Sequence, residues 1–185
     1  MSNKVSAAKP KIGGAVSVAP SGTALPTDAR TALAAAFTPL GYISDDGLTN
    51  SNNIETDSIK AWGGDEVLTI YNGREDSFQY MLLEALDLNV LKQVYGAENV
   101  TGTLEDGIAI NVKSNYEFPE QVLVIDMTLK DGNLKRIVIP AGRVAEVGDI
   151  TYSDNDAIGY ETTIKALPDA SGNTHYEYIA APSNG

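Results

Sequence analysis

Residues 76–96 have the sequence DSFQYMLLEALDLNVLKQVYG, the one long run in the chain whose apolar residues follow a helical period. Asp76 suits an N-cap, because its carboxylate can accept hydrogen bonds from the first-turn amides, and Gln79 follows in the capping-box position. A break is expected near Asp87, with a second short helix that starts at Asn89 and ends at Gly96. The pattern predicts helix over 76–95, with one face formed by Phe78, Met81, Leu82, Ala85 and Leu86.

The sequence on either side of this helical run alternates instead with a period of two. Residues 66–71 predict a strand before the helix. After it, residues 121–129 and 134–139 predict a hairpin around the Asp131-Gly132 step, with Pro140 ending the second strand. Further strands are expected at residues 15–19, 108–112, 143–152, 157–167 and 174–179, and one or two helical turns at 29–37. Strands spaced by roughly ten residues indicate a mainly β (α+β) fold, a β-sandwich or β-barrel with one flanking helix.

Three segments fit neither period. Residues 1–11 are small, polar and basic, which predicts an N-terminal arm, and residues 180–185 predict a frayed C-terminal tail. Residues 41–66 predict a long loop, and a loop of this length in a compact domain is usually functional. Its large apolar side chains suggest contacts with another subunit, with the candidates Tyr42, Ile43, Leu48, Ile54, Ile59 and Trp62. Residues 1–185 are expected to form a single domain.

Composition removes several classes of function. The chain has no cysteine, which excludes disulfides, thiolate catalysis and cysteine-ligated metals, and it has one histidine, His175. The net charge of −12, from 13 basic and 25 acidic residues, argues against simple DNA binding because it repels phosphates. The sequence shows no signal peptide and no membrane-spanning run, so synthesis in the cytoplasm and no membrane partner are expected.

A search for catalytic motifs finds no phosphate-binding glycine loop, serine-nucleophile elbow or zinc helix. His175 is expected to be an exposed strand residue. The paired carboxylates fall in predicted turns or caps, where Asp bonds to the backbone, and Asp154-x-Asp156 lacks the later ligands of a calcium loop. We therefore expect no catalytic residues, no cofactor, no metal and no enzymatic activity.

Two other functions stay open at this point. Trp62 and the nine tyrosines could stack on sugars, which would make the chain a monomeric carbohydrate-binding β-sandwich. Paired carboxylates could instead serve an acid–base hydrolase, which predicts a deep pocket holding a carboxyl group of raised pKa.

Four stretches, taken in order, resemble the major tail tube protein of long-tailed, non-contractile bacteriophages (the siphovirus type). They are TALPTDA at 23–29, residues 37–44 leading into DDGLT at 45–49, IKAWGG at 59–64, and residues 78–95 with their LLEAL and VLKQVYG segments. The likeness covers about residues 12 to 180. None of these stretches is a catalytic signature.

The resemblance implies a structural virion protein that self-assembles into hexameric rings stacked as a hollow tail tube, the conduit for genome ejection. Each subunit would add strands to a continuous inner β-barrel, while long loops and terminal arms join the rings. Implied partners are further copies of the chain, the tape measure protein, tail-end proteins and passing double-stranded DNA. The implied location is the phage tail, after assembly in the host cytoplasm. An acidic lumen would repel DNA, with Glu146 and Glu161 as candidate lumen-facing acids.

Overall fold

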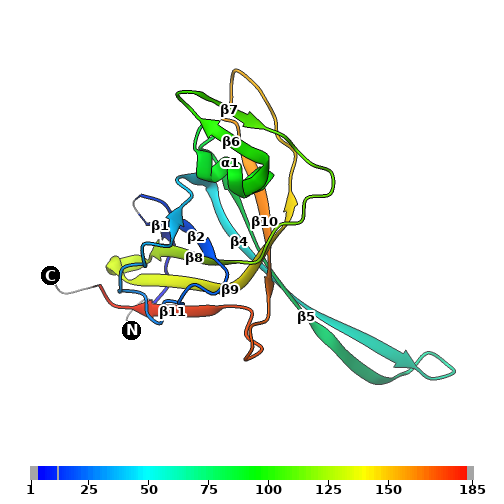
Figure 1. Cartoon of the computed structure of the whole chain (residues 1–185). Coiled ribbons are helices and arrows are strands. Elements are labelled where there is room, and N and C mark those ends of the chain that lie inside the picture. Colours follow the sequence, from blue (N-terminus) through cyan, green and yellow to red (C-terminus); the bar gives the residue numbers. More distant parts are fainter. Residues whose placement is uncertain (1–3, 12, 183–185) are drawn as a thin grey trace.

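The computed structural model describes residues 4–11 and 13–182, and within them the fold is mainly β with one α-helix (Figure 1). The elements are β1 (Lys9–Pro10), β2 (Val16–Pro20), β3 (Thr38–Pro39), β4 (Ile43–Lys60), β5 (Glu66–Leu82), α1 (Leu88–Tyr95), η1 (Ala97–Asn99), β6 (Val100–Thr103), β7 (Gly107–Ile110), β8 (Gln121–Thr128), η2 (Lys130–Gly132), β9 (Leu134–Val147), β10 (Tyr160–Leu167) and β11 (Tyr176–Ala180).

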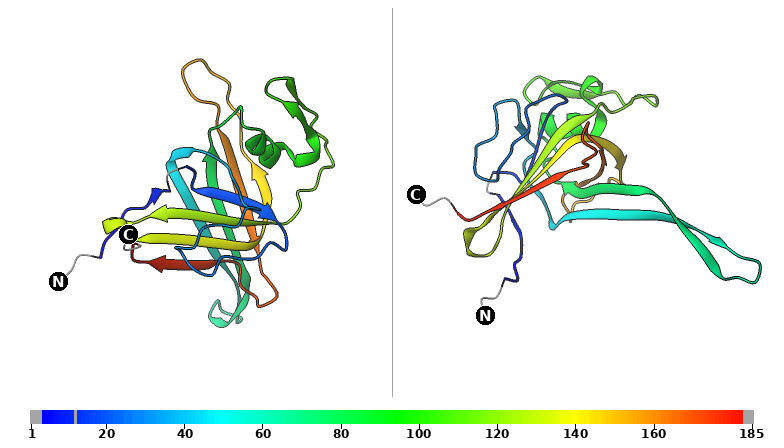
Figure 2. Two further views of the ribbon diagram at one scale, coloured as in Figure 1. Left: turned by 60° about the vertical axis from the view of Figure 1, so that its left-hand side comes forward. Right: turned by 90° about the horizontal axis from the view of Figure 1, so that it is seen from below.

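The described residues form one nine-stranded antiparallel sheet, ordered β3-β2-β8-β9-β10-β5-β4, with β1 added on β8 and β11 on β9. Strands β6 and β7 form a separate hairpin. We call β3, β2, β8, β11 and residues 134–139 of β9 the covered half-sheet. Residues 141–147 of β9 with β10, β5 and β4 are the open half-sheet. Figure 2 shows the strands of the two halves crossing, as expected for the predicted β-sandwich class.

The main core lies where the two half-sheets and α1 face one another. Leu123, Ile125, Ile137 and Ile139 come from the covered half-sheet. The open half-sheet and the helix supply further fully or nearly fully buried side chains: Phe78, Tyr80, Leu82, Ile164, Val90, Leu91 and Val94. Every strand residue in this set alternates with a residue on the opposite face, so the period of two decides which side chains become core.

Strand β9 joins the two halves by bending. It pairs with β11 up to Val138 and with β10 from Ala141 onward, while β8 pairs with it through Ile139 and once more at Gly142. Pro140, predicted to end the strand, lies at this change of partner and has no place in any of the three ladders, so its missing N–H costs no hydrogen bond. At Gly142 a Cβ would lie 2.3 Å from the Leu123 side chain, so the bend requires glycine.

The predicted helix over 76–95 is wrong in its first part. Residues up to Leu82 belong to β5, where Phe78, Tyr80 and Leu82 face the core, and Asp76 caps no helix. Only α1 is helical, and its N-cap is Asp87, whose carboxylate accepts from the amides of Asn89 and Val90. The apolar residues of this part fit a helical period as well as a strand period. Pairing with β4 and β10, a tertiary interaction, makes them a strand.

Other predicted segments also change. Residues 41–66 are mostly strand β4 and not a loop, and residues 29–37 contain no helix. The expected N-terminal arm contributes β1, which pairs with β8, and residues 1–3 of it lie outside the described residues. Residues 183–185 of the predicted tail lie outside them too. The β8–β9 hairpin is confirmed, with positive φ at both Asp131 and Gly132 as a type I′ turn requires.

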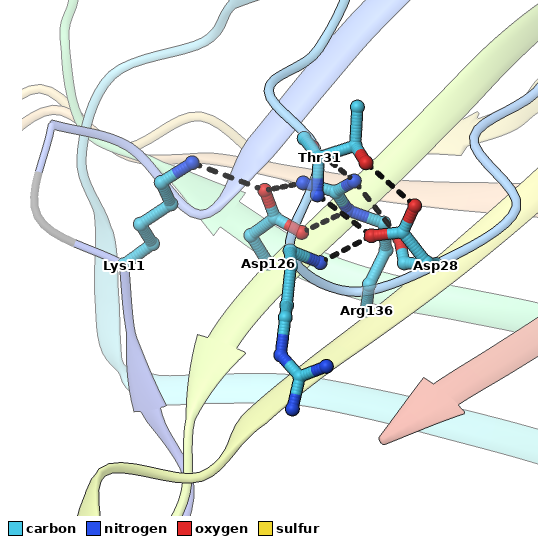
Figure 3. Close-up of polar contacts among 6 residues, drawn as sticks. Lys11, Asp28, Thr31, Asp126 and Arg136 are labelled. Carbon is cyan, nitrogen blue, oxygen red and sulfur yellow. Dashed lines mark hydrogen bonds and ion pairs between the residues drawn. The ribbon is translucent and has the colours of Figure 1, made fainter. Parts of the chain in front are cut away.

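The outer face of the covered half-sheet is closed by residues 20–40. Phe37 packs there on Val122, Val124 and Val138. On the same face lies a buried ion pair: the guanidinium of Arg136, 2% exposed, donates to both carboxylate oxygens of Asp126 at 2.6 and 2.9 Å (Figure 3).

Arg136 also holds the covering segment in place. Its remaining nitrogen donates to the backbone oxygens of Asp28 and Thr31, at 3.0 and 2.8 Å. Within that segment the hydroxyl and amide of Thr31 and the amide of Arg30 donate to the Asp28 carboxylate, which lowers the pKa of Asp28 to about 2. Lys11 reaches Asp126 from the other side at 3.4 Å. One arginine therefore links the sheet to a segment about a hundred residues earlier.

Replacing Arg136 with methionine is expected to lower the free energy of unfolding by about 3–5 kcal/mol, because it leaves the Asp126 carboxylate buried without its main partner. Urea denaturation measures this. Lys11→Met removes the exposed partner of the same carboxylate and should cost only about 0–1 kcal/mol. Asp126→Leu combined with Arg136→Met should recover much of the loss. Equal losses for the two single variants would contradict this assignment.

Candidate assembly surfaces

A long hairpin leaves the body of the protein. From Asn53↔Glu75 outward, β4 and β5 pair only with each other, and the ribbon projects well beyond the other strands (Figures 1 and 2). We call residues 53–75 the arm. Its tip is the turn 61–65, closed by hydrogen bonds from Ala61 N to Asp65 O and from Gly64 N to Ala61 O. Gly63 and Gly64 have φ values of 124° and 99°, which this turn requires.

The arm exposes a concentration of large apolar side chains. Trp62 at the tip is as exposed as an isolated residue, at 107%. On β5, Leu68 and Ile70 share one face with Ile59, which pairs with Leu68, while Tyr71 lies on the other; the exposed Val67 sits at an irregularity of the ladder opposite Ile59 and Lys60. Ile54 is also exposed. A two-stranded ribbon is marginally stable alone in water, so these side chains on both faces mark a surface suited to burial against a partner.

A buried carboxylate holds the base of the arm. Asp76 is 1% exposed and accepts hydrogen bonds from Asn50 Nδ2 at 2.6 Å and Thr174 Oγ1 at 2.7 Å. Its second oxygen also lies 2.5 Å from His175 Nδ1, whose ring packs edge-on against Phe78. His175 is therefore mostly buried, contrary to the exposed position predicted for it. The cluster ties both arm strands to the segment before β11.

The outer face of the open half-sheet is polar, and among the described residues no layer covers it. It carries Gln79, Thr163, Lys165, Glu146 and Glu161, because residues paired across antiparallel strands share a face. Glu161 accepts from Gln79 at 2.9 Å, and Lys165 donates to Glu75 at 2.5 Å. That hydrogen bond and charge raise the pKa of Lys165.

The open half-sheet also has two free edges. The described residues give β4 no backbone partner other than β5, and give residues 143–147 of β9 none other than β10. Unpaired edges are sites where another chain can add a strand.

The predicted subunit contacts divide into two groups. Ile54, Ile59 and Trp62 lie on the arm, and Tyr42 is exposed just before β4. Ile43 and Leu48 are partly buried against the core of their own subunit. The sequence analysis missed Val67, Leu68, Ile70 and Tyr71 as contacts, although it correctly predicted a strand over residues 66–71. The exposure of these side chains on both faces of a ribbon could not be inferred from that prediction.

Some acidic residues converge near the start of β4. Asp45 and Asp46 line a cavity of about 400 Å³ together with Asp149 and Asp156. Two of the four carboxylates accept local hydrogen bonds: Asp156 from the Ala157 amide, as predicted for a turn residue, and Asp46 from Ser44 Oγ, although Asp46 lies in β4 and not in the predicted turn. The described residues contain no group of three or more His, Cys, Asp or Glu side chains placed to hold a metal ion. They also contain no helix long and apolar enough to cross a membrane.

One comparison with known proteins agrees with the tail tube resemblance noted in the sequence. A family model described as phage tail tube protein matches residues 3–183. No curated protein matches the chain significantly. The family match spans both half-sheets, the arm and the helix, and its members are structural proteins of the virion tail. The chain therefore belongs to the phage tail tube protein family.

Proposed function

We propose that residues 1–185 act as one tail tube domain, six copies of which close into a ring, and that the rings stack into a hollow tube for genome ejection. The open half-sheet is the observation that carries this proposal, because it combines two free edges with one uncovered polar face. The tube would be assembled in the host cytoplasm, around the tape measure protein and against tail-end proteins, with double-stranded DNA passing through without tight binding.

Strand direction favours closure into a ring. The four strands of the open half-sheet alternate in direction, since each pair in the order β9-β10-β5-β4 is antiparallel. The outermost strands, β9 and β4, therefore run in opposite directions. When β4 of one copy adds to β9 of the next, the new pair is antiparallel as well. A head-to-tail contact that repeats in this way closes into a ring, whose inner wall is a continuous barrel.

The polar face would then line the bore. Three carboxylates lie on it, Glu75, Glu146 and Glu161, together with two cations that are already paired: Lys165 with Glu75, and Arg143 with Glu120. The two remaining acids are those that the sequence suggested for the lumen. If the wall bound DNA phosphates even weakly, the binding would repeat at every ring and would hold back the DNA. A wall that repels phosphates avoids this.

The arm supplies the second contact that a filament needs. It projects outside the sheet that forms the ring, so its apolar side chains would be buried on neighbouring copies. Fully burying a side chain of the size of Leu68 or Ile70 contributes about 1.5–3 kcal/mol. Several such side chains on each arm give a favourable stacking contact for every subunit.

Purified protein is expected to form rings or tubes in negative-stain electron microscopy, and a shortened arm should abolish the tubes. Residues 55–73 can be replaced by Asn-Gly, because Ile54 and Arg74 pair directly opposite each other and the base at Asp76 is kept. The shortened protein should still unfold cooperatively in circular dichroism.

A second variant keeps the length of the arm and tests the contribution of its apolar side chains alone. Ile59→Thr, Leu68→Thr and Ile70→Thr together keep strand propensity but remove one apolar face, and should also abolish tubes. Ser58→Thr with Thr69→Ser changes a facing pair on the other side of the ribbon and should leave tubes intact. Normal tubes from the shortened protein would refute this role of the arm, and monodisperse single copies of the unaltered protein at every concentration would refute the tube itself.

Reversing the two candidate lumen acids should slow DNA exit without preventing assembly. Phage carrying Glu146→Lys and Glu161→Lys are expected to show normal tails but slower genome release, because the bore would now attract phosphates. Dye fluorescence of released DNA measures the rate. Glu105→Lys, at the exposed β6–β7 turn away from this sheet, is the matched control. An unchanged release rate in the double variant would contradict an electrostatic role for these acids.

A further inference from the structure

A groove of about 510 Å³ lies beside α1. Its walls come from β2, from the helix and its following turn, and from residues 116–121. Much of the lining is apolar, with side chains of Val18, Pro20, Ala36, Ala97, Tyr116 and Phe118. The two aromatic rings are in edge-to-face contact with centroids 5.1 Å apart, so this wall of the groove is already packed in a fixed arrangement.

The groove also presents a positive charge. Lys92 lines it from the last turn of α1, and no described residue forms an ion pair with it. The carboxylate of Glu120, which lies in the same lining, is paired with Arg143 at 3.2 Å. An incoming carboxylate would therefore meet an available ammonium next to an apolar surface.

The tip of the arm carries the complementary groups. Trp62 offers a fully exposed indole, and Asp65, three residues on in the same turn, has a carboxylate with no hydrogen bond or ion pair within the described residues. Residues 53–75 hold five acidic and two basic side chains, so the arm as a whole is negative. Apolar surface and charge both match between the tip and the groove.

The arm of the same chain does not occupy the groove. The arm leaves the body at its lower right in Figure 1, while α1 lies at the top, and the tip points away from the helix. Two copies placed head to tail bring the arm of one toward the helix end of the other. The fit is thus between successive copies.

We propose that the groove beside α1 receives the arm tip of a copy in the adjacent ring, with Trp62 on the apolar wall and Asp65 beside Lys92. This inference rests on the proposed stacking of rings and names the surface that receives the arm. It assigns α1 a role in joining rings, in addition to its role in the core of the subunit.

Exchanging the two charges tests the pairing. Lys92→Glu and Asp65→Lys should each raise the protein concentration needed for tube formation by about tenfold, measured by light scattering and pelleting. The protein carrying both changes should return to within about twofold of the unaltered protein, because the ion pair is restored with reversed sign. Absence of any recovery in the double variant would overturn the pairing.

Cross-linking tests the placement, and the absence of cysteine gives a clean background. Trp62→Cys with Asn89→Cys, an exposed residue at the rim of the groove, should give a ladder of covalent multimers when tubes are treated with a short bismaleimide. Trp62→Cys with Ala170→Cys, on an exposed turn away from the groove, should not. A ladder only from the control pair, or dimers from Trp62→Cys alone, would overturn the proposal.

The outcomes separate this inference from the function on which it rests. Tubes that form normally but give no Asn89 cross-link would refute docking in the groove and leave the tube intact. Cross-linking of the groove to a tail-end protein only, in whole virions, would also refute it. Failure of the unaltered protein to form rings or tubes under any condition would refute both.

Discussion

Strand β9 belongs to both half-sheets, and its bend sets how they face each other. Before Pro140 the strand pairs with β8 and β11, and from Ala141 on it pairs with β10, with β8 still opposite it at Gly142. The bend depends on a close approach at Gly142, where any larger residue would meet the side chains of Leu123 and Ile164. This contact lies between the inner faces of the two halves, so the bend decides how the two halves meet across the main core.

The two halves produced by this bend have different surfaces. The covered half-sheet is buried on both faces, by the main core on one side and by residues 20–40, held through Arg136, on the other. The open half-sheet is buried on one face only. A sheet with one solvated polar face and two unpaired edges is an aggregation risk in a monomer, but it is a suitable component for a closed barrel. The same asymmetry gives one subunit both a half-sheet that is buried on its two faces and a half-sheet with free edges, which the proposed ring would pair.

The sequence predicted the fold class and the β8–β9 hairpin, because strict alternation and an Asp-Gly turn are local signals. It failed where two periods coexist. Phe78 and Leu82 fit one face of a helix as well as one face of a strand, and only the hydrogen bonds from β4 and β10 decide between them. Pro140 was expected to end a strand because proline has no N–H to donate to a ladder. The strand continues because Pro140 lies where no ladder needs that donor, and this gap depends on β10 and β11, which are distant in sequence.

The sequence also predicted the assembly surfaces only in part, because their strand pairing depends on residues that are distant in sequence. The large apolar residues of 41–66 correctly suggested a special segment, but its polar composition concealed a strand of eighteen residues. The residues of β5 that pair with this segment were predicted to form an ordinary strand, because the local sequence does not show that a strand is exposed on both faces. Asp76 was assigned to a helix cap because a buried carboxylate and a cap have the same local sequence. The residues that reveal its role, Thr174 and His175, lie near the other end of the chain.

That distance has a consequence for biosynthesis. Asp76 acquires two of its three partners only after residues 174 and 175 have emerged from the ribosome, so a nascent chain cannot yet fix the base of the arm. The anchoring of the arm therefore depends on contacts between residues 98 and 99 positions apart, which can form only after the segment before β11 has been synthesised.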